Sequence, residues 1–359
     1  MIKIGKLRPT IGHMILNTAL YFENDKPFTI IVNSKSEISN LAVYEIIKFN
    51  YQKSKKAVYM TGILYIYLYK IIVKTSQFVP FFSKILSDID FIHRKTSFEP
   101  QYGSQYKFWS RHTFDRFPSF KVPNKIVEKF NNWKRVNGIT GKFICVFARD
   151  DGYWGGNDQV VENIRNSSIS ELELTINYLI KKGFWVVRLG RDYSNSSGVL
   201  SIANKEKYID YQNSKDVSDE VDVMLIRYTE LFIGSNSGLS NIQLLFNTKM
   251  VLLNWAPAGL GPPYCNCQYI MKRYKKHGVS TPFRSIDKSI LLSEDSEYIK
   301  EMGYSIEENK SDEILKIVSE SINQDGKSVN NQDNYQFIVS KGRSTLNNEW
   351  TKDNKFLFN

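Results

Sequence analysis

In the second half of the chain, apolar runs of strand length alternate with segments of helical pattern. The runs include FICVFA at 143–148, FWVVRLG at 184–190 and MVLLNW at 250–255. Helical spacing is found in ISELELTINYLIKKG at 169–183 and in VDVMLIRYTE at 221–230. Strands that are apolar along their whole length are typical of a parallel sheet covered on both faces. The alternation therefore predicts a doubly wound α/β domain.

Boundary residues sharpen the expected helix at 169–183. Ser170 is the expected N-cap, Glu173 stands three residues later at the capping-box position, and Gly183 lies just past the helix. Farther along, LFIGS at 231–235 is expected as a strand, followed by a helix over LSNIQLLFN at 239–247.

The first half repeats the alternation less clearly. Strands are expected at 2–7 and 28–33, each followed by a helical stretch, the second of them with Ser39 or Asn40 as N-cap. This order suggests another parallel sheet. From 57 to about 120 aromatic residues are dense and the periodicity is mixed.

Two breaks divide the chain into three segments. VNGITGK at 136–142 interrupts the pattern with two glycines, and a polar stretch begins near residue 323. We expect an N-terminal domain over 1–138, a C-terminal domain over 139–322 and a tail over 323–359. The tail holds apolar residues that are expected to dock back on a domain: Phe337, Leu346, Trp350, Phe356 and Phe358.

Charge is distributed unevenly between the two halves. Residues 1–140 contain 22 Lys and Arg against 9 Asp and Glu, a net +13, whereas residues 141–359 have a net charge of −2. A basic half of this kind suits phosphate backbones, anionic lipid headgroups or a pyrophosphate-bearing acceptor, or it is simply a solvated surface. The basic residues are scattered and match no nucleic-acid-binding module, so no nucleic-acid partner is expected.

Localisation signals point to the cytoplasm. No signal-peptide pattern is visible at the N-terminus, and the apolar stretch at 57–69 is shorter than the roughly 20 residues of a membrane span. The three cysteines, Cys145, Cys265 and Cys267, are too few for a disulfide framework. We expect a cytoplasmic protein, with a peripheral position at the inner face of the plasma membrane as one possibility.

Metal ligands are sparse in this sequence. The pair Cys265 and Cys267 lacks further ligands, and the D-x-D of Asp88 and Asp90, with His93 close behind, lies in the poorly patterned region. No metal site and no resident cofactor are expected.

Three strands of the second half end in residues suited to binding an anion, and ligands of open parallel sheets bind at the carboxyl ends of strands. Arg149 and Asp150 follow the first of these strands, and Gly190 follows the second. The guanidinium of Arg149 suits a diphosphate, and Asp150 suits the arginine or a ribose hydroxyl. An Arg–Asp pair that only braces the sheet is the alternative.

The third strand end is a turn of small residues before an expected helix. Its glycines permit close approach, the serines offer hydroxyls, and a helix N-terminus favours anions. The turn lacks the lysine of a P-loop and the spacing of a dinucleotide-binding loop, and an ordinary strand-to-helix turn remains possible. Its residues are Gly234, Ser235, Asn236, Ser237 and Gly238.

Four further residues complete the candidate site. Arg188 lies inside a buried strand, so it needs either a structural carboxylate or a ligand phosphate. Arg165 and Asn166 precede the 169–183 helix and are expected near the same crevice. His13 stands at the first strand-to-helix turn, where it suits a general base, a helix cap or simple packing.

These segments resemble bacterial glycosyltransferases of the GT-B superfamily. The likeness covers most of the chain and rests on IGHMILN, FARDDGY, IRNSSI, GFWVVRLGRD, YIDYQNS and FIGSNSGLSNIQLLFNTKMVLLNW. The last segment is similar to the donor site of heptosyltransferases, and the Arg149–Asp150 loop to the phosphate loop of fucosyltransferases. The helix after Ser237 lacks the heptosyltransferase histidine, and Lys249 stands where a proline is usual.

The resemblance implies two Rossmann-like domains whose parallel sheets face an interdomain cleft. The C-terminal half would bind a nucleotide-sugar and the N-terminal half a glycan, lipid-linked or protein acceptor, as in surface polysaccharide or glycoconjugate synthesis. Arg149 and the 234–238 turn would stabilise the leaving diphosphate without metal, and His13 would make the transfer inverting. A non-catalytic nucleotide-sugar-binding protein and a sugar epimerase of the same fold are the alternatives.

Overall fold

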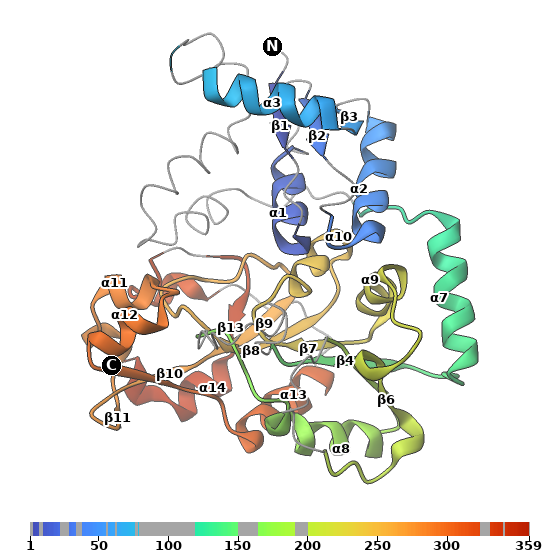
Figure 1. Ribbon diagram of the computed structural model, residues 1–359. Helices are drawn as coiled ribbons and strands as arrows, with labels where there is room; N and C mark the ends of the chain where they lie inside the picture. Colours follow the sequence, from blue (N-terminus) through green and yellow to red (C-terminus); the bar gives the residue numbers. More distant parts are fainter. Residues whose placement is uncertain are drawn as a thin grey trace.

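The computed structural model describes residues 3–6, 10–21, 29–33, 38–54, 57–61, 63–75, 78, 119–149, 164–190, 200–323, 331–339 and 342–358. Among these residues two units stand out, each built on a parallel sheet (Figure 1). The α/β class predicted for both halves is confirmed.

A seven-stranded parallel sheet forms the centre of the C-terminal unit, in the order β13-β9-β8-β7-β4-β5-β6. All residues of β4, β7 and β8 are buried, as the unbroken apolar runs predict. The bounds of the strands are β4 Phe143–Phe147, β5 Trp185–Arg188, β6 Tyr208–Asp210, β7 Phe232–Gly234, β8 Met250–Trp255, β9 Cys267–Met271 and β13 Thr345–Leu346.

Helices cover both faces of this sheet. In Figure 1, α8 and α13 lie together on one side of it, and α9, α10 and α7 lie on the other. Crossover helices of this kind are what parallel strands require. The helix bounds are α7 Asn124–Val136, α8 Glu173–Lys181, α9 Asp219–Tyr228, α10 Gln243–Phe246, α13 Ser311–Asn323 and α14 Asn348–Asp353.

The strand order contains one reversal of direction. From β4 the chain adds β5 and β6 on one side, then returns to place β7 on the other side of β4 and continues outward to β8 and β9. The reversal leaves β4 and β7 as neighbours whose following segments turn to opposite faces. In open α/β sheets this switch point is where ligands bind.

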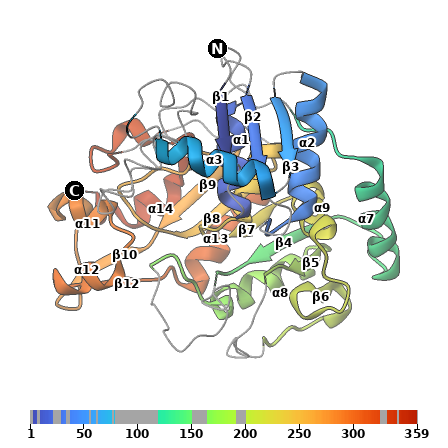
Figure 2. The same cartoon turned by 45° about the horizontal axis from the view of Figure 1, so that its top comes forward.

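The N-terminal unit contains a smaller sheet of three parallel strands in the order β1-β2-β3. Figures 1 and 2 show α3 lying across these strands. Asn40 is the N-cap of α2, since its Oδ1 accepts from the Val43 N–H at 2.8 Å. The bounds are β1 Lys3–Lys6, α1 Ile11–Tyr21, β2 Thr29–Asn33, α2 Leu41–Ser54, β3 Ala57–Thr61 and α3 Ile63–Thr75.

The two units are in direct contact through helices. α1 meets the 3₁₀ turn Ser240–Ile242, and α2 packs on α9. The Leu41 N–H, at the start of α2, donates to Asp219 Oδ2 at 2.7 Å. The segment that leads into α7 touches both units, because the Asn50 amide bonds the backbone of Lys121 in both directions and the Phe120 N–H donates to Leu245 O.

The C-terminal segment packs against the C-terminal unit. Its strand β13 pairs with β9 and extends the large sheet. The side chains of Phe337, Leu346, Trp350 and Phe358 are buried, whereas Phe356 is exposed. A small antiparallel sheet, β11-β10-β12, lies beside this segment. Its strands are β10 Arg273–Lys276, β11 Val279–Ser280 and β12 Tyr304–Glu307, and the helices α11 Lys288–Leu292 and α12 Ser296–Glu301 come between β11 and β12 in the chain.

The prediction for the helix at 169–183 needs correction. The 169–183 segment begins as the 3₁₀ helix Ile169–Leu172, whose N-cap is Ser168 rather than Ser170. Glu173 accordingly makes no capping box; its carboxylate accepts from the Ser201 N–H at 2.8 Å. The apolar stretch at 57–69 is split between β3 and α3. Among the described residues, no helix combines the length and apolarity that crossing a bilayer requires.

Candidate functional site at the switch point

The carboxyl ends of β4 and β7 are joined by a hydrogen bond just beyond the strands. Phe147 and Gly234 are register partners at the ends of these strands. Two residues later, the Arg149 N–H donates to Ser235 Oγ at 2.9 Å. The arginine that the sequence assigns to phosphate binding thus stands at the topological switch point, beside the small-residue turn. Asp150 lies outside the described residues.

The segment before the 3₁₀ helix Ile169–Leu172 runs beside Arg149. The Ser167 N–H donates to Arg149 O at 2.8 Å, so the backbone of Arg149 is held on both sides. Arg165 and Asn166, directly before Ser167, are half-buried. The structure therefore brings these two residues and Arg149 to one edge of the sheet, where the sequence predicted them.

A buried lysine that the sequence reasoning missed holds the same segment. Lys272 Nζ donates to Asn166 O and lies 3.7 Å from Glu308 Oε1, while Glu308 Oε2 accepts from the Ser168 N–H at 2.9 Å. Burial lowers the pKa of Lys272 and Glu308 opposes that shift. Lys272 directly follows the three buried residues at the end of β9, Tyr269, Ile270 and Met271, and a charge after such a run is the signal that could have found it.

The turn after β7 is more enclosed than a phosphate loop needs to be. Ser235, Asn236 and Ser237 are 1%, 4% and 8% exposed. Asn236 Nδ2 donates to Ala256 O at 3.2 Å, and Ser237 Oγ accepts from the Ser240 N–H at 3.4 Å. These polar side chains thus satisfy neighbouring backbone groups, one just after β8 and one at the start of the following 3₁₀ turn.

The expected helix after this turn is also much shorter than the sequence pattern suggests. Residues Ser240–Ile242 form a 3₁₀ turn and α10 adds only Gln243–Phe246, ending at Asn247 in the left-handed region with φ 54°. A segment this short has a small dipole, because the macrodipole sums over aligned peptide units. Its N-terminus therefore offers an anion less partial positive charge than a long helix would, and the anion site at this turn stays a prediction.

Glycines at the turn allow the two units to touch. A Cβ added at Gly12 would lie 2.7 Å from Asn241 Nδ2 and 3.2 Å from Gly238 Cα. One added at Gly238 would lie 3.3 Å from the Gly12 backbone nitrogen. Real Cβ atoms do not approach another atom as closely as 2.7 Å, so alanine at Gly12 would force a shift, whereas a contact of 3.3 Å at Gly238 is tight but needs only a small adjustment. The start of α1 is in this way seated on the turn that follows β7.

His13 is the residue after Gly12 and is half-buried. Its Nδ1 lies 2.9 Å from Thr10 Oγ1, a contact that orients the imidazole. The sequence predicts His13 at a strand-to-helix turn that faces the other half. In the structure the preceding residue, Gly12, lies directly against the turn after β7.

Arg188 has the structural carboxylate that its buried position requires. Its NH1 lies 3.5 Å from Asp210 Oδ2, and the two residues are register partners on β5 and β6. Gly190, two residues on, has φ +125°, and a Cβ there would lie 3.1 Å from Gln212 Oε1 and 3.3 Å from Phe147. The ion pair satisfies Arg188 without a ligand phosphate.

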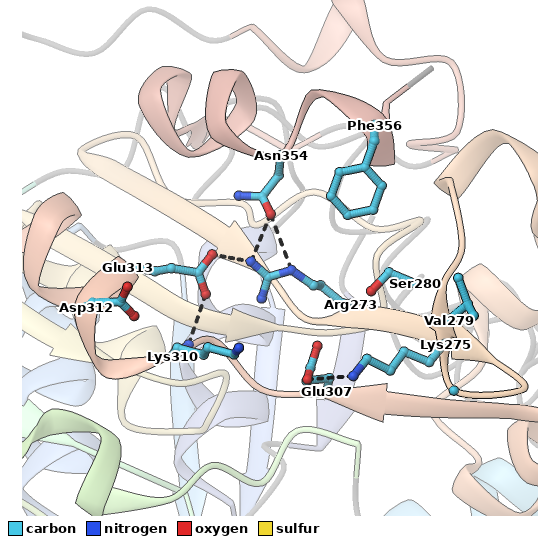
Figure 3. A pocket seen from close by; sticks show the side chains of 11 residues that line it. Arg273, Lys275, Val279, Ser280, Glu307, Lys310, Asp312, Glu313, Asn354 and Phe356 are labelled. Atoms are coloured by element: carbon cyan, nitrogen blue, oxygen red, sulfur yellow. Dashed lines mark hydrogen bonds and ion pairs between the residues drawn. The ribbon is translucent and has the colours of Figure 1, made fainter.

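A separate groove lies beside the small antiparallel sheet. It has a volume of about 610 Å³ and is lined by none of the predicted site residues. Figure 3 shows two of its cations paired: Arg273 with Glu313 and Asn354, and Lys275 with Glu307 at 2.7 Å. Because it lies apart from the predicted site residues, we assign the groove no part in the site.

No three His, Cys, Asp or Glu side chains gather as metal ligands in the part of the chain that the structure describes. The two cysteines of the C-x-C pair have different surroundings, since Cys265 is exposed and Cys267 is buried. Asp88, Asp90 and His93 lie outside the described residues.

Three solved glycosyltransferases are similar in structure to this chain. One is the iron-containing dodecameric glycosyltransferase TibC of enterotoxigenic E. coli H10407, with 14% identity, a TM-score of 0.37, and coverage of 70% of this chain and 57% of that one. The chain thus spans just over half the length of TibC.

The other two are heptosyltransferases of E. coli. ADP-heptose LPS heptosyltransferase II has 13% identity, a TM-score of 0.43, and coverage of 78% of this chain and 92% of that chain. Heptosyltransferase WaaC with ADP has 8% identity, a TM-score of 0.41, and coverage of 90% and 98%. No protein-family model and no curated protein sequence matches the chain. The function is therefore argued from this chain's own residues.

Proposed function

We propose that the protein is a glycosyltransferase that moves a sugar from a nucleotide-sugar donor to a glycan, lipid-linked or protein acceptor. The observation that carries the proposal is the hydrogen bond from the Arg149 N–H to Ser235 Oγ, at the switch point of a doubly wound sheet. This bond holds the backbone of Arg149 beside the turn after β7, and the other unit meets the same turn through Gly12; both observations support a donor diphosphate site there.

In this proposal the C-terminal unit binds the donor. The guanidinium of Arg149 takes the diphosphate, with Arg165 and Asn166 on the adjoining segment, which Lys272 and Glu308 hold in place. Positive charge at that position stabilises the nucleoside diphosphate as the bond to the sugar breaks. Asp150 would read a ribose hydroxyl, and the transfer would proceed without a divalent metal.

The N-terminal unit would supply the base. The acceptor hydroxyl attacks the anomeric carbon, its proton passes to His13 Nε2, and the nucleoside diphosphate leaves with the electrons of the broken C–O bond. Thr10 Oγ1 would hold the ring through Nδ1. A single displacement of this kind inverts the anomeric configuration.

The place of action is part of the same proposal. The basic half suits an anionic surface, and we propose that the protein works in the cytoplasm at the inner face of the plasma membrane, in surface polysaccharide or glycoconjugate synthesis.

A ligand screen tests the proposal first. Melting curves are measured with UDP-, GDP-, dTDP-, ADP- and CMP-sugars, because a ligand that binds only the native state raises its stability. We expect one nucleotide class to raise the melting temperature of the parent and not that of Arg149→Ala. Arg135→Ala is the matched control, since Arg135 is an exposed arginine on α7.

Product analysis then separates the candidate reactions. The stabilising donor is incubated with EDTA, with and without a mixture of glycan and lipid acceptors. Transfer to acceptor in EDTA supports the full proposal. Transfer that returns only with Mn²⁺ or Mg²⁺ would reject metal independence. An altered sugar without acceptor would indicate an epimerase, and binding without any product a non-catalytic protein.

A further inference from the structure

The outward face of α3 carries a continuous stripe of exposed apolar side chains. Leu64, Tyr67, Leu68 and Ile71 are between 47% and 66% exposed. At 3.6 residues per turn these positions lie within about 100° of the helix circumference. Ile66 is 6% exposed, and α3 contacts β1 and β2. The helix therefore has one face on its sheet and a second apolar face in solvent.

Basic residues accompany this stripe. Lys70 and Lys74 are both exposed, and α3 contains no acidic residue. Lys70 Nζ lies 5.8 Å from the centroid of the Tyr67 ring, so a cation stands directly beside an exposed aromatic. Phe78, shortly after the helix, is 79% exposed. The half of the chain that contains α3 is also basic, because residues 1–140 have a net charge of +13.

This combination of apolar and basic residues is typical of a helix that binds a lipid surface. A helix of 13 residues is too short to cross a bilayer, which takes about 20, but suits a position in the plane of the interface. There the apolar stripe enters the acyl boundary, the tyrosine lies at headgroup level and the lysines meet anionic headgroups. A second copy of the chain would bring two strongly basic surfaces together, which is electrostatically unfavourable.

We propose that the α3 face, defined as Leu64, Tyr67, Leu68, Lys70, Ile71 and Lys74, docks on an anionic bilayer. Figure 1 shows α3 at the end of the N-terminal unit away from the seven-stranded sheet. The inference rests on the proposed function for its biological purpose, and it specifies the element through which a membrane-bound acceptor would be reached.

Co-sedimentation of the full chain with vesicles tests this docking without any sugar transfer. We expect binding to vesicles of equal parts phosphatidylcholine and phosphatidylglycerol, little binding to phosphatidylcholine alone, and loss of binding in high salt. Leu68→Glu with Ile71→Glu should weaken partition at least about tenfold. Lys70→Ala with Lys74→Ala should weaken partition onto these vesicles about 25-fold, since each lysine near an anionic surface strengthens binding about fivefold.

Controls come from the C-terminal unit. Leu174→Glu places the same change at an exposed leucine of α8, and Lys205→Ala removes an exposed lysine; both should bind vesicles like the parent. All α3 positions changed are exposed, so melting curves should stay unaltered.

Three results would overturn the assignment. The first is equal binding to both kinds of vesicle. The second is unchanged binding by the Leu68→Glu, Ile71→Glu protein. The third is a dimeric parent and a monomeric double variant in sedimentation velocity, with no vesicle binding by either protein. The stripe would then be a subunit interface. Failure here with intact sugar transfer would leave the enzyme proposal standing.

Discussion

The two sheets of this protein are both parallel, but helices cover their faces to different extents. In the C-terminal unit β4 and β8 are buried throughout, helices cover both faces, and the terminal segment adds β13 to an edge. In the N-terminal unit α3 covers its sheet with one face and leaves a second apolar face exposed. Among the described residues, helices thus cover both faces of the larger sheet, whereas the helix on the smaller sheet leaves an apolar stripe in solvent.

The same contrast holds at the candidate site. The C-terminal unit fixes Arg149 through two backbone hydrogen bonds and holds the neighbouring segment with Lys272 and Glu308. Among the residues that the structure describes, the N-terminal unit meets the site through the start of α1, at Gly12. This difference suggests a division of labour, with donor binding in the C-terminal unit and acceptor chemistry in the N-terminal one.

The largest effect is expected from His13→Ala. Loss of a general base should lower turnover by roughly 10²–10⁴-fold. Donor affinity, measured by calorimetry, should stay close to the parental value, because the donor is assigned to the other unit. His277→Asn is a control at an exposed histidine with φ 51°, a conformation that asparagine tolerates. Parental turnover in folded His13→Ala would remove the N-terminal unit from the chemistry.

Arg149→Ala should produce the complementary result. A lost hydrogen bond to a charged group costs about 1.5–3 kcal/mol, or about ten- to a hundred-fold in donor affinity. The Arg149 N–H that bonds Ser235 remains in the variant, so the fold should be kept. Calorimetric titration of donor into both proteins gives the comparison, with Arg135→Ala alongside. Unchanged affinity would move the phosphate site away from the end of β4.

Gly12→Ala tests whether the two units depend on each other. The new Cβ would lie 2.7 Å from Asn241 Nδ2, and overpacking of this kind costs about 1–3 kcal/mol of unfolding free energy. Gly238→Ala, with a closest contact of 3.3 Å, should cost less. Gly141→Ala is the matched control, since its nearest atom would be 3.9 Å away. Urea melts that do not rank the three variants in this order would contradict the close interface.

The smallest effect concerns Lys272 and appears in the pH dependence of stability. Burial lowers its pKa in the folded protein, so the unfolded chain binds the proton more tightly. The free energy of unfolding should therefore rise as pH increases through the folded pKa toward about 10.4, the unfolded value. In Lys272→Met this contribution is absent. Urea melts at stepped pH give the difference between the two proteins, and parallel curves would show that the lysine is not desolvated.

Local sequence determined much of this architecture. The apolar runs at 143–148 and 250–255 gave β4 and β8, because a strand buried on both faces has to be apolar at every position. Asn40 signalled the start of α2 through its own side chain. The short strands β6, β9 and β13 escaped prediction, since two or three residues or a mixed polar pattern carry too little periodicity.

Tertiary structure alone decided which distant residues share the site. Nothing near Asn166 in sequence points to Lys272 or Glu308, and only the crossovers of the sheet bring the three together. In the sequence Gly12 and Gly238 belong to separate turns, yet in the structure their backbones lie against each other, and a Cβ at Gly12 would also meet Asn241. Periodicity and capping report the surroundings of a residue along the chain. Contacts across the chain depend on strand order and on how the units pack, which no local pattern encodes.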